Sequence, residues 1–233
     1  MSHDHGHAHH PHSAAAWDER YGSADRLWTA QANPALIREA AELTPGTALD
    51  VGSGEGADAR WLADRGWHVT AVDISQVALD RAAAMDSRET IAWRRVDLTA
   101  EKVPSTGSGS GEVGSGSDED RSGDGAGGSE GGAGYDLVSM HYFPVAIDRA
   151  DVIAALVDAL APGGTLLVVA HDPEGIRAHG HDPDEYFQPA DVAEKFADRL
   201  DVRRLAMVPR GRPAGGTAGR RHMDDVVLRA TRR

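Results

Sequence analysis

Leu49-Asp50-Val51-Gly52-Ser53-Gly54-Glu55-Gly56 joins an apolar run, residues 47–51, to a segment with a helical pattern, residues 57–65. This order predicts a buried strand, a glycine-rich turn and a helix. Glycine lets the backbone approach a ligand where a side chain would block it, and the free N–H groups at a helix start attract polar ligand groups. The stretch therefore predicts a nucleotide-binding turn.

Acidic residues stand near the glycine turn and after the next two apolar runs. Asp73 follows residues 69–72 and Asp97 follows residues 91–96. A carboxylate about 20 residues beyond such a turn is placed to accept hydrogen bonds from a ribose diol. Asp50, two residues before Gly52, either braces the turn or contacts the cofactor, and the sequence leaves both roles open.

The glycines alone do not identify the ligand, because Gly52-x-Gly54-x-x-Ala57 also satisfies a dinucleotide-binding pattern. Further along the chain, the stretch 160–164, Leu-Ala-Pro-Gly-Gly, leads into another apolar run, residues 165–169. With the acids already described, this order resembles the class I S-adenosylmethionine (SAM)-dependent methyltransferases from about Asn33 to the C-terminus. An NAD-type oxidoreductase and a catalytically inactive Rossmann-like scaffold remain the alternatives.

Strand-like and helix-like segments alternate along the chain, which predicts an α/β fold with a doubly wound, mostly parallel sheet. Two strand-like runs close together at the end resemble the antiparallel pair that completes the seven-stranded sheet of these methyltransferases. The expected strands are 47–51, 67–72, 90–96, 135–140, 164–170, 201–208 and 224–230, and the expected helices are 35–43, 56–65, 75–85, 149–160 and 190–199.

The resemblance assigns roles to residues at the strand ends. It implies that the glycine loop faces the methionine part of SAM, that Asp73 binds the ribose hydroxyls and that Asp97 binds the adenine amino group. Ile74 and Leu98 are then candidates to enclose the purine. The loop residues implied to bind the cofactor are Asp50, Gly52, Ser53, Gly54 and Gly56.

An aromatic segment, residues 14–32, precedes the expected domain, residues 33–233. Trp17 and Tyr21 are four residues apart and share one face if the segment is helical, and Trp28 follows. The segment either packs onto the domain or forms a flap over the cofactor. It resembles the N-terminal segments of thiopurine- and tellurite-type methyltransferases, which favours a small-molecule acceptor with a sulfur, selenium or tellurium nucleophile.

Methyl transfer from a sulfonium is a direct displacement, and a general base helps where the acceptor carries a proton. His141 and His171 follow two expected strands and are the candidates, because imidazole titrates near neutral pH. The formal net charge of −13 and the lack of cysteine argue against nucleic-acid acceptors. The absence of cysteine also fits a cytoplasmic protein, and no apolar run approaches the length of a membrane span.

Two segments are too polar to form a core. Residues 1–13 are expected to be a disordered tail, and residues 104–134 an acidic, Gly/Ser-rich disordered insert within the domain. A loop of that length normally counts against an assignment, but recognisable strands flank it. The tail histidines His3, His5, His7 and His9 could bind a divalent metal ion weakly.

Overall fold

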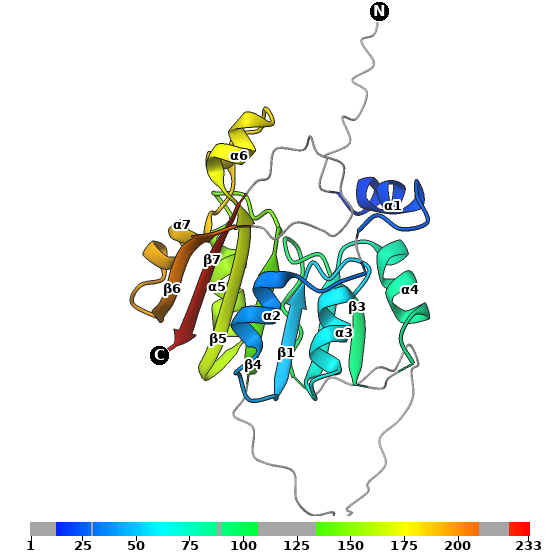
Figure 1. Ribbon diagram of the computed structural model, residues 1–233, viewed down its shortest axis with the longest axis horizontal. Coiled ribbons are helices and arrows are strands. Elements are labelled where there is room, and N and C mark those ends of the chain that lie inside the picture. Colours follow the sequence, from blue (N-terminus) through cyan, green and yellow to red (C-terminus); the bar gives the residue numbers. More distant parts are fainter. Residues whose placement is uncertain (1–12, 29, 88–89, 107–133, 210–223) are drawn as a thin grey trace, which may run out of the picture.

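The computed structural model describes residues 13–28, 30–87, 90–106, 134–209 and 224–233 (Figure 1). Its centre is a seven-stranded sheet in the order β3-β2-β1-β4-β5-β7-β6. The strands are β1 (Thr47–Val51), β2 (His68–Asp73), β3 (Ile91–Arg95), β4 (Tyr135–His141), β5 (Leu160–His171), β6 (Leu200–Val208) and β7 (Asp225–Arg232).

Strands β1 to β5 are parallel to one another, whereas β7 is antiparallel to both of its neighbours. The fold class predicted from the sequence, including the antiparallel C-terminal pair, is thus confirmed. Strand β1 lies between β2 and β4, so the chain order reverses beside it. In open α/β sheets such a switch point, at the carboxyl ends of the strands, is the usual ligand site.

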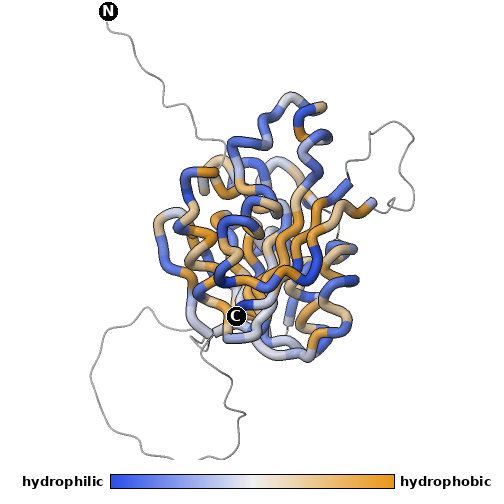
Figure 2. The backbone as a smooth tube through the Cα atoms, turned by 90° about the vertical axis from the view of Figure 1, so that its left-hand side faces the viewer, coloured by the Kyte–Doolittle hydropathy of each residue, from blue (hydrophilic) through white to orange (hydrophobic). Residues whose placement is uncertain are grey.

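Helices cover both faces of the sheet, and the apolar strands lie between them (Figures 1 and 2). One apolar cluster joins the sheet to α5 and α7, and a second joins it to α2 and α3. The helices are α1 (Ala14–Gly22), α2 (Pro34–Ala40), α3 (Ala57–Ala63), α4 (Gln76–Ala84), α5 (Ala150–Asp158), α6 (Pro173–Ala178) and α7 (Pro189–Lys195), with a short 3₁₀ helix at Pro183–Glu185.

Two boundaries differ from the sequence-based expectation. No helix was expected between residues 170 and 190, yet α6 forms there because Asp172 caps the Gly175 N–H at 2.8 Å and Pro173 starts the helix. Strand β5 begins at Leu160 rather than 164, because Leu160 pairs with Tyr135 across a register shift. Helix α6 is hard to recognise in the sequence because none of its residues is buried, so it has no apolar face with helical spacing.

The two-residue period of the strands brings the polar candidates to one face. Residues of the α2/α3-side cluster alternate along the strands, at positions 48, 69, 71, 137, 167, 169 and 227. The polar residues that continue the same alternation toward the carboxyl ends of the parallel strands are Asp50, Asp73, Ser139, His141 and His171, and Asp225 begins β7 at this edge. The sheet therefore gathers these side chains at one edge of one face.

Candidate active site

The glycine turn after β1 has a backbone that other residues adopt only with strain. Gly52, Gly54 and Gly56 have φ angles of +68°, +52° and +75°, and Gly56 caps the start of α3. A Cβ atom on Gly52 would lie 2.8 Å from Phe143 and one on Gly54 would lie 2.8 Å from the Tyr21 hydroxyl. Both the φ angles and the close neighbours explain why this turn requires glycine.

Asp73 binds two backbone segments: one carboxylate oxygen holds the glycine turn, and the other holds the start of α4. The side chain is buried, and it accepts the N–H groups of Gly54 and Ser75, each at 2.8 Å. Burial raises the pKa of the Asp73 carboxyl above its usual value, although these backbone donors oppose the change. Each carboxylate oxygen has a second lone pair, so Asp73 can brace the turn and still accept a ligand hydroxyl.

Asp50 is more isolated. Its side chain is buried, and its Oδ2 atom has no hydrogen-bond partner among the described residues; the same is true of the Ser53 Oγ atom. Burial, together with the negative charges of Asp58 and Asp73, raises the pKa of Asp50 well above the usual range. A buried acid with an open oxygen beside a second open polar atom suits a cationic or hydrogen-bonding ligand group.

The aromatic segment lies on the glycine turn. Tyr21 is buried, accepts a hydrogen bond from Trp28 Nε1 at 3.1 Å and lies directly over Gly54. Burial, and then the charge of Asp73, raises the pKa of Tyr21 to about 12, so its hydroxyl stays protonated. Trp17 packs against Tyr21 with ring centroids 6.0 Å apart. The three predicted aromatic residues are therefore brought together beside the turn.

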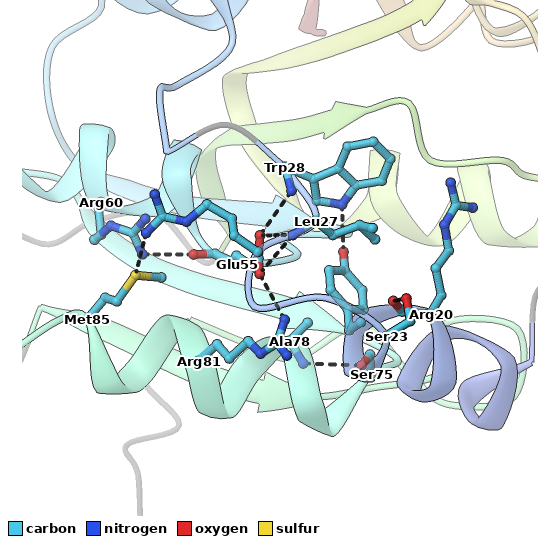
Figure 3. Close-up of polar contacts among 12 residues, drawn as sticks. Arg20, Ser23, Leu27, Trp28, Glu55, Arg60, Ser75, Ala78, Arg81 and Met85 are labelled. Carbon is cyan, nitrogen blue, oxygen red and sulfur yellow. Dashed lines mark hydrogen bonds and ion pairs between the residues drawn. The ribbon is translucent and has the colours of Figure 1, made fainter.

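Acidic residues that the sequence analysis did not single out hold this segment in place (Figure 3). The Glu55 carboxylate accepts the N–H groups of Leu27 and Trp28, each at 3.2 Å, and lies 3.3 Å from Arg81. Asp18 of α1 accepts the Ser75 hydroxyl at 2.5 Å, which ties the segment to the start of α4. Both contacts join parts of the chain that are distant in sequence, so no local pattern predicts them.

Asp97, Ile74 and Leu98 lie near the ends of β2 and β3 but differ in surroundings. The Asp97 carboxylate closes its own turn, accepting the N–H and hydroxyl of Thr99 at 2.9 and 2.6 Å. Leu98 is buried in the cluster on the α5/α7 side, whereas Ile74 is half-buried. The Asp73 carbonyl accepts the Val96 N–H at 3.0 Å, so the two strand ends are adjacent.

His141, one of the two predicted general bases, lies in a buried polar network. Its side chain is only 7% exposed, and both ring nitrogens are occupied. Nδ1 lies 2.6 Å from the Asp58 carboxylate and Nε2 lies 3.2 Å from the Ser139 hydroxyl. Asp58 also accepts the Asn33 N–H at 2.6 Å, so His141 belongs to a buried network that joins β4 to α3 and the start of α2.

His171 has different surroundings. Its side chain is 28% exposed, and Nδ1 lies 3.6 Å from the buried carboxylate of Asp225. The ring stacks on Tyr142 with centroids 4.4 Å apart. Of the two predicted histidines, His171 is thus the one with a solvent-accessible imidazole.

The predicted metal ligands of the tail, His3, His5, His7 and His9, lie outside the described residues, as do residues 107–133 of the insert. Within the described ranges, no cluster of three or more His, Asp or Glu side chains is arranged to hold a metal ion. The helices that the structure describes include none with the length and apolar character needed to cross a membrane.

Comparison with solved structures gives the same architecture. The N-methyltransferase NodS of Bradyrhizobium japonicum, solved with S-adenosylhomocysteine, is 17% identical, with a TM-score of 0.64 over 95% of this chain and 98% of NodS. TehB of Haemophilus influenzae is 14% identical, with a TM-score of 0.60 over 94% of this chain and 67% of TehB. At these identities the likeness shows the fold alone.

Sequence comparison is more specific. An uncharacterized methyltransferase of Mycobacterium tuberculosis is 28% identical over 158 residues, which cover 66% of this chain. The match spans 65% of that relative's length, and a Mycobacterium bovis relative matches equally well. Residues 49–166, about half of the chain, match the family model described as a methyltransferase domain. The chain therefore belongs to the methyltransferase domain family.

Proposed function

We propose that this protein transfers a methyl group from SAM to a small-molecule acceptor. The observation that carries the proposal is the set of open polar atoms at the glycine turn. Asp50 Oδ2 and Ser53 Oγ are buried without partners among the described residues, and they flank a turn with three glycines at positive φ. The residues present fit the cofactor, because its amino-acid part carries an ammonium group that suits a buried carboxylate.

The residues around the glycine turn are proposed to bind different parts of SAM. Asp50 and Ser53 hold the amino-acid end, and Asp73 accepts the ribose hydroxyls on lone pairs that its two backbone donors leave open. Asp97, Ile74 and Leu98 bound the adenine end at β3. Trp17, Tyr21 and Trp28 cover the turn and exclude water. When bound, SAM supplies an activated methyl group, so the protein contributes mainly alignment.

Cofactor binding tests the proposal directly. Calorimetric titration of the full chain should show binding of S-adenosylhomocysteine and SAM, and no binding of NAD. Asp73→Ala should weaken S-adenosylhomocysteine binding by at least the roughly 10-fold that one charged hydrogen bond of about 1.5–3 kcal/mol implies. Asp80→Ala, which removes an exposed carboxylate of α4, is the matched control. Preference for NAD, or unchanged affinity in folded Asp73→Ala, contradicts the proposal.

The acceptor class has two candidates. The aromatic segment over the turn favours an acceptor with a sulfur, selenium or tellurium nucleophile. Such a nucleophile needs little help from a base. A nucleophile with an N–H or O–H bond needs a base, and the surroundings of His171 favour it. Methylation of a thiophenol compared with an aniline and a catechol separates the two candidates.

A further inference from the structure

Three side chains from the ends of different strands meet at the sheet edge where β5 ends and β7 begins. His171 ends β5 and is the register partner of Asp225, which begins β7. Tyr142, the residue after β4, donates its hydroxyl to Asp225 Oδ2 at 2.8 Å and stacks on the His171 ring at 4.4 Å. Asp225 thus faces the tyrosine hydroxyl with one oxygen and the imidazole with the other, which lies 3.6 Å from His171 Nδ1.

The backbone at Tyr142 is strained to allow this arrangement. Its φ angle is +52°, and among the described residues it is the one non-glycine residue with a positive φ. Such a conformation costs about 1–3 kcal/mol and tends to occur at functional sites. The Tyr142 N–H donates to the Val169 carbonyl at 2.8 Å, so the turned backbone remains attached to β5. This backbone conformation places the Tyr142 ring against that of His171, with an angle of 26° between the ring planes.

The exposed fractions of the Asp225 and His171 side chains match those expected for an orienting carboxylate and a base. The Asp225 side chain is 5% exposed, whereas that of His171 is 28% exposed. Because Nδ1 faces the carboxylate, Nε2 is the ring nitrogen left to face a substrate. The separation of 3.6 Å is longer than a hydrogen bond, as is common for catalytic pairs before substrate binds.

We propose that Asp225 orients His171 as the general base for an acceptor that carries an N–H or O–H bond, with Tyr142 fixing both groups. This inference rests on the proposed methyl transfer and narrows its acceptor class. The acceptor lone pair forms the new bond to the methyl carbon, and the broken carbon–sulfur bond leaves its electron pair on the donor sulfur. His171 Nε2 takes the acceptor proton, and Asp225 stabilises the resulting imidazolium before the proton passes to solvent.

Among the described residues, the charged and titratable groups that face His171 can be named, which makes the pH dependence of the reaction interpretable. From β7 it faces Asp225, and from the end of β4 it faces Tyr142. Asp172, the next residue, directs its carboxylate to the Gly175 N–H of α6. The other histidine at this edge, His141, is occupied by Asp58 and Ser139. A rate that rises with pH and loses that dependence in His171→Gln is therefore assigned to His171.

A spectroscopic test does not depend on knowing the acceptor. In the complex of the full chain with S-adenosylhomocysteine, the Nδ1 proton of His171 should give a far-downfield proton resonance. The resonance should vanish in His171→Gln and in Asp225→Asn, and it should remain in His181→Gln, which changes an exposed histidine. Its absence from the wild type, or its persistence in Asp225→Asn, overturns the pairing.

A kinetic test uses an aniline, a catechol and a thiophenol as probe acceptors. Transfer to the aniline or catechol should fall about 10²–10⁴-fold in His171→Gln, and the double variant with Asp225→Asn should be no slower than the slower single variant. Transfer to the thiophenol, which is largely anionic at neutral pH, should change little. Equal losses of rate on all three probes contradict the base role. So does a loss in the double variant that equals the product of the losses in the two single variants. Failure of the wild type to bind S-adenosylhomocysteine instead contradicts the proposed function.

Discussion

Replacing Asp50 by Asn should stabilise the ligand-free protein and weaken its binding of S-adenosylhomocysteine. The Asp50 side chain is 3% exposed, and its Oδ2 atom lacks a hydrogen-bond partner among the described residues. Burial and the charges of Asp58 and Asp73 hold its pKa well above the usual range. An amide of the same shape carries no charge and offers N–H donors toward those neighbouring carboxylates.

The pH dependence of the stabilisation has a definite sign. A carboxyl whose pKa is higher in the folded state holds its proton more tightly there, so the free energy of unfolding falls as pH rises above the ordinary value of 3.8. Each tenfold difference in proton affinity corresponds to about 1.4 kcal/mol. Because Asn does not titrate, the advantage of the variant should be small near pH 4 and should grow toward neutral pH.

The magnitude follows from the lost burial penalty. An unsatisfied buried polar group costs about 1–3 kcal/mol, and in a protein of this size each kcal/mol moves the Tm by about 2–4 °C. The Tm of Asp50→Asn at pH 7 should therefore rise by roughly 2–12 °C. Loss of a charged hydrogen bond to the ligand, about 1.5–3 kcal/mol, should weaken S-adenosylhomocysteine binding roughly 10–150-fold.

Scanning calorimetry at pH 4 and pH 7, with titration calorimetry at pH 7, measures both effects. Glu42→Gln removes an exposed carboxylate and controls for the change in net charge. A lower Tm for Asp50→Asn at pH 7 combined with unchanged ligand affinity would refute the reasoning. That result would assign Asp50 the other role left open by the sequence, bracing the glycine turn.

Three further variants test the surroundings of the turn. Gly54→Ala should weaken S-adenosylhomocysteine binding measured by calorimetry, because its Cβ would lie 2.8 Å from the Tyr21 hydroxyl. The control is Gly163→Ala, at φ +78° with nothing within 4 Å, which should lower the free energy of unfolding only by the backbone strain of about 1–2 kcal/mol. Glu55→Gln should speed tryptic cleavage at Arg20 and Arg26, because it weakens the carboxylate contacts to the N–H groups of Leu27 and Trp28; an unchanged cleavage rate contradicts this role. His141→Gln should lower stability to urea by about 1–3 kcal/mol yet leave the pH profile of methyl transfer in place, and loss of that profile would return the base role to His141.

The strand ends could be predicted from the sequence because they depend on local patterns. An apolar run followed by glycine or an acid marks the carboxyl end of a strand, and the period of two then fixes which face each residue occupies. Strand β1 has the predicted bounds, and the predicted cofactor residues at the ends of β1 and β2 lie together. The family could be predicted from the sequence because the motifs that resemble those of methyltransferases lie at the carboxyl ends of these strands.

The different surroundings of the two histidines could not be predicted in this way. Each follows an apolar strand, so their local sequences are similar. His141 is occupied by Asp58, which lies 83 residues earlier in the chain and reaches it only because α3 packs on β1, the strand beside β4. Asp225 comes opposite His171 only through the antiparallel register of β7 with β5. Both contacts are set by sheet topology, and no spacing in the sequence encodes them.

The turn after β4 links the two halves of the site. Phe143 packs against Gly52 of the cofactor turn, while its neighbour Tyr142 stacks on His171 two strands away from β1. Adjacent strands are about 4.8 Å apart, so the imidazole lies about 10 Å from the cofactor turn across the sheet. The Tyr142 backbone, with its φ of +52° and its N–H bonded to the Val169 carbonyl, thus holds the tyrosine ring on His171 while Phe143 packs on the glycine turn.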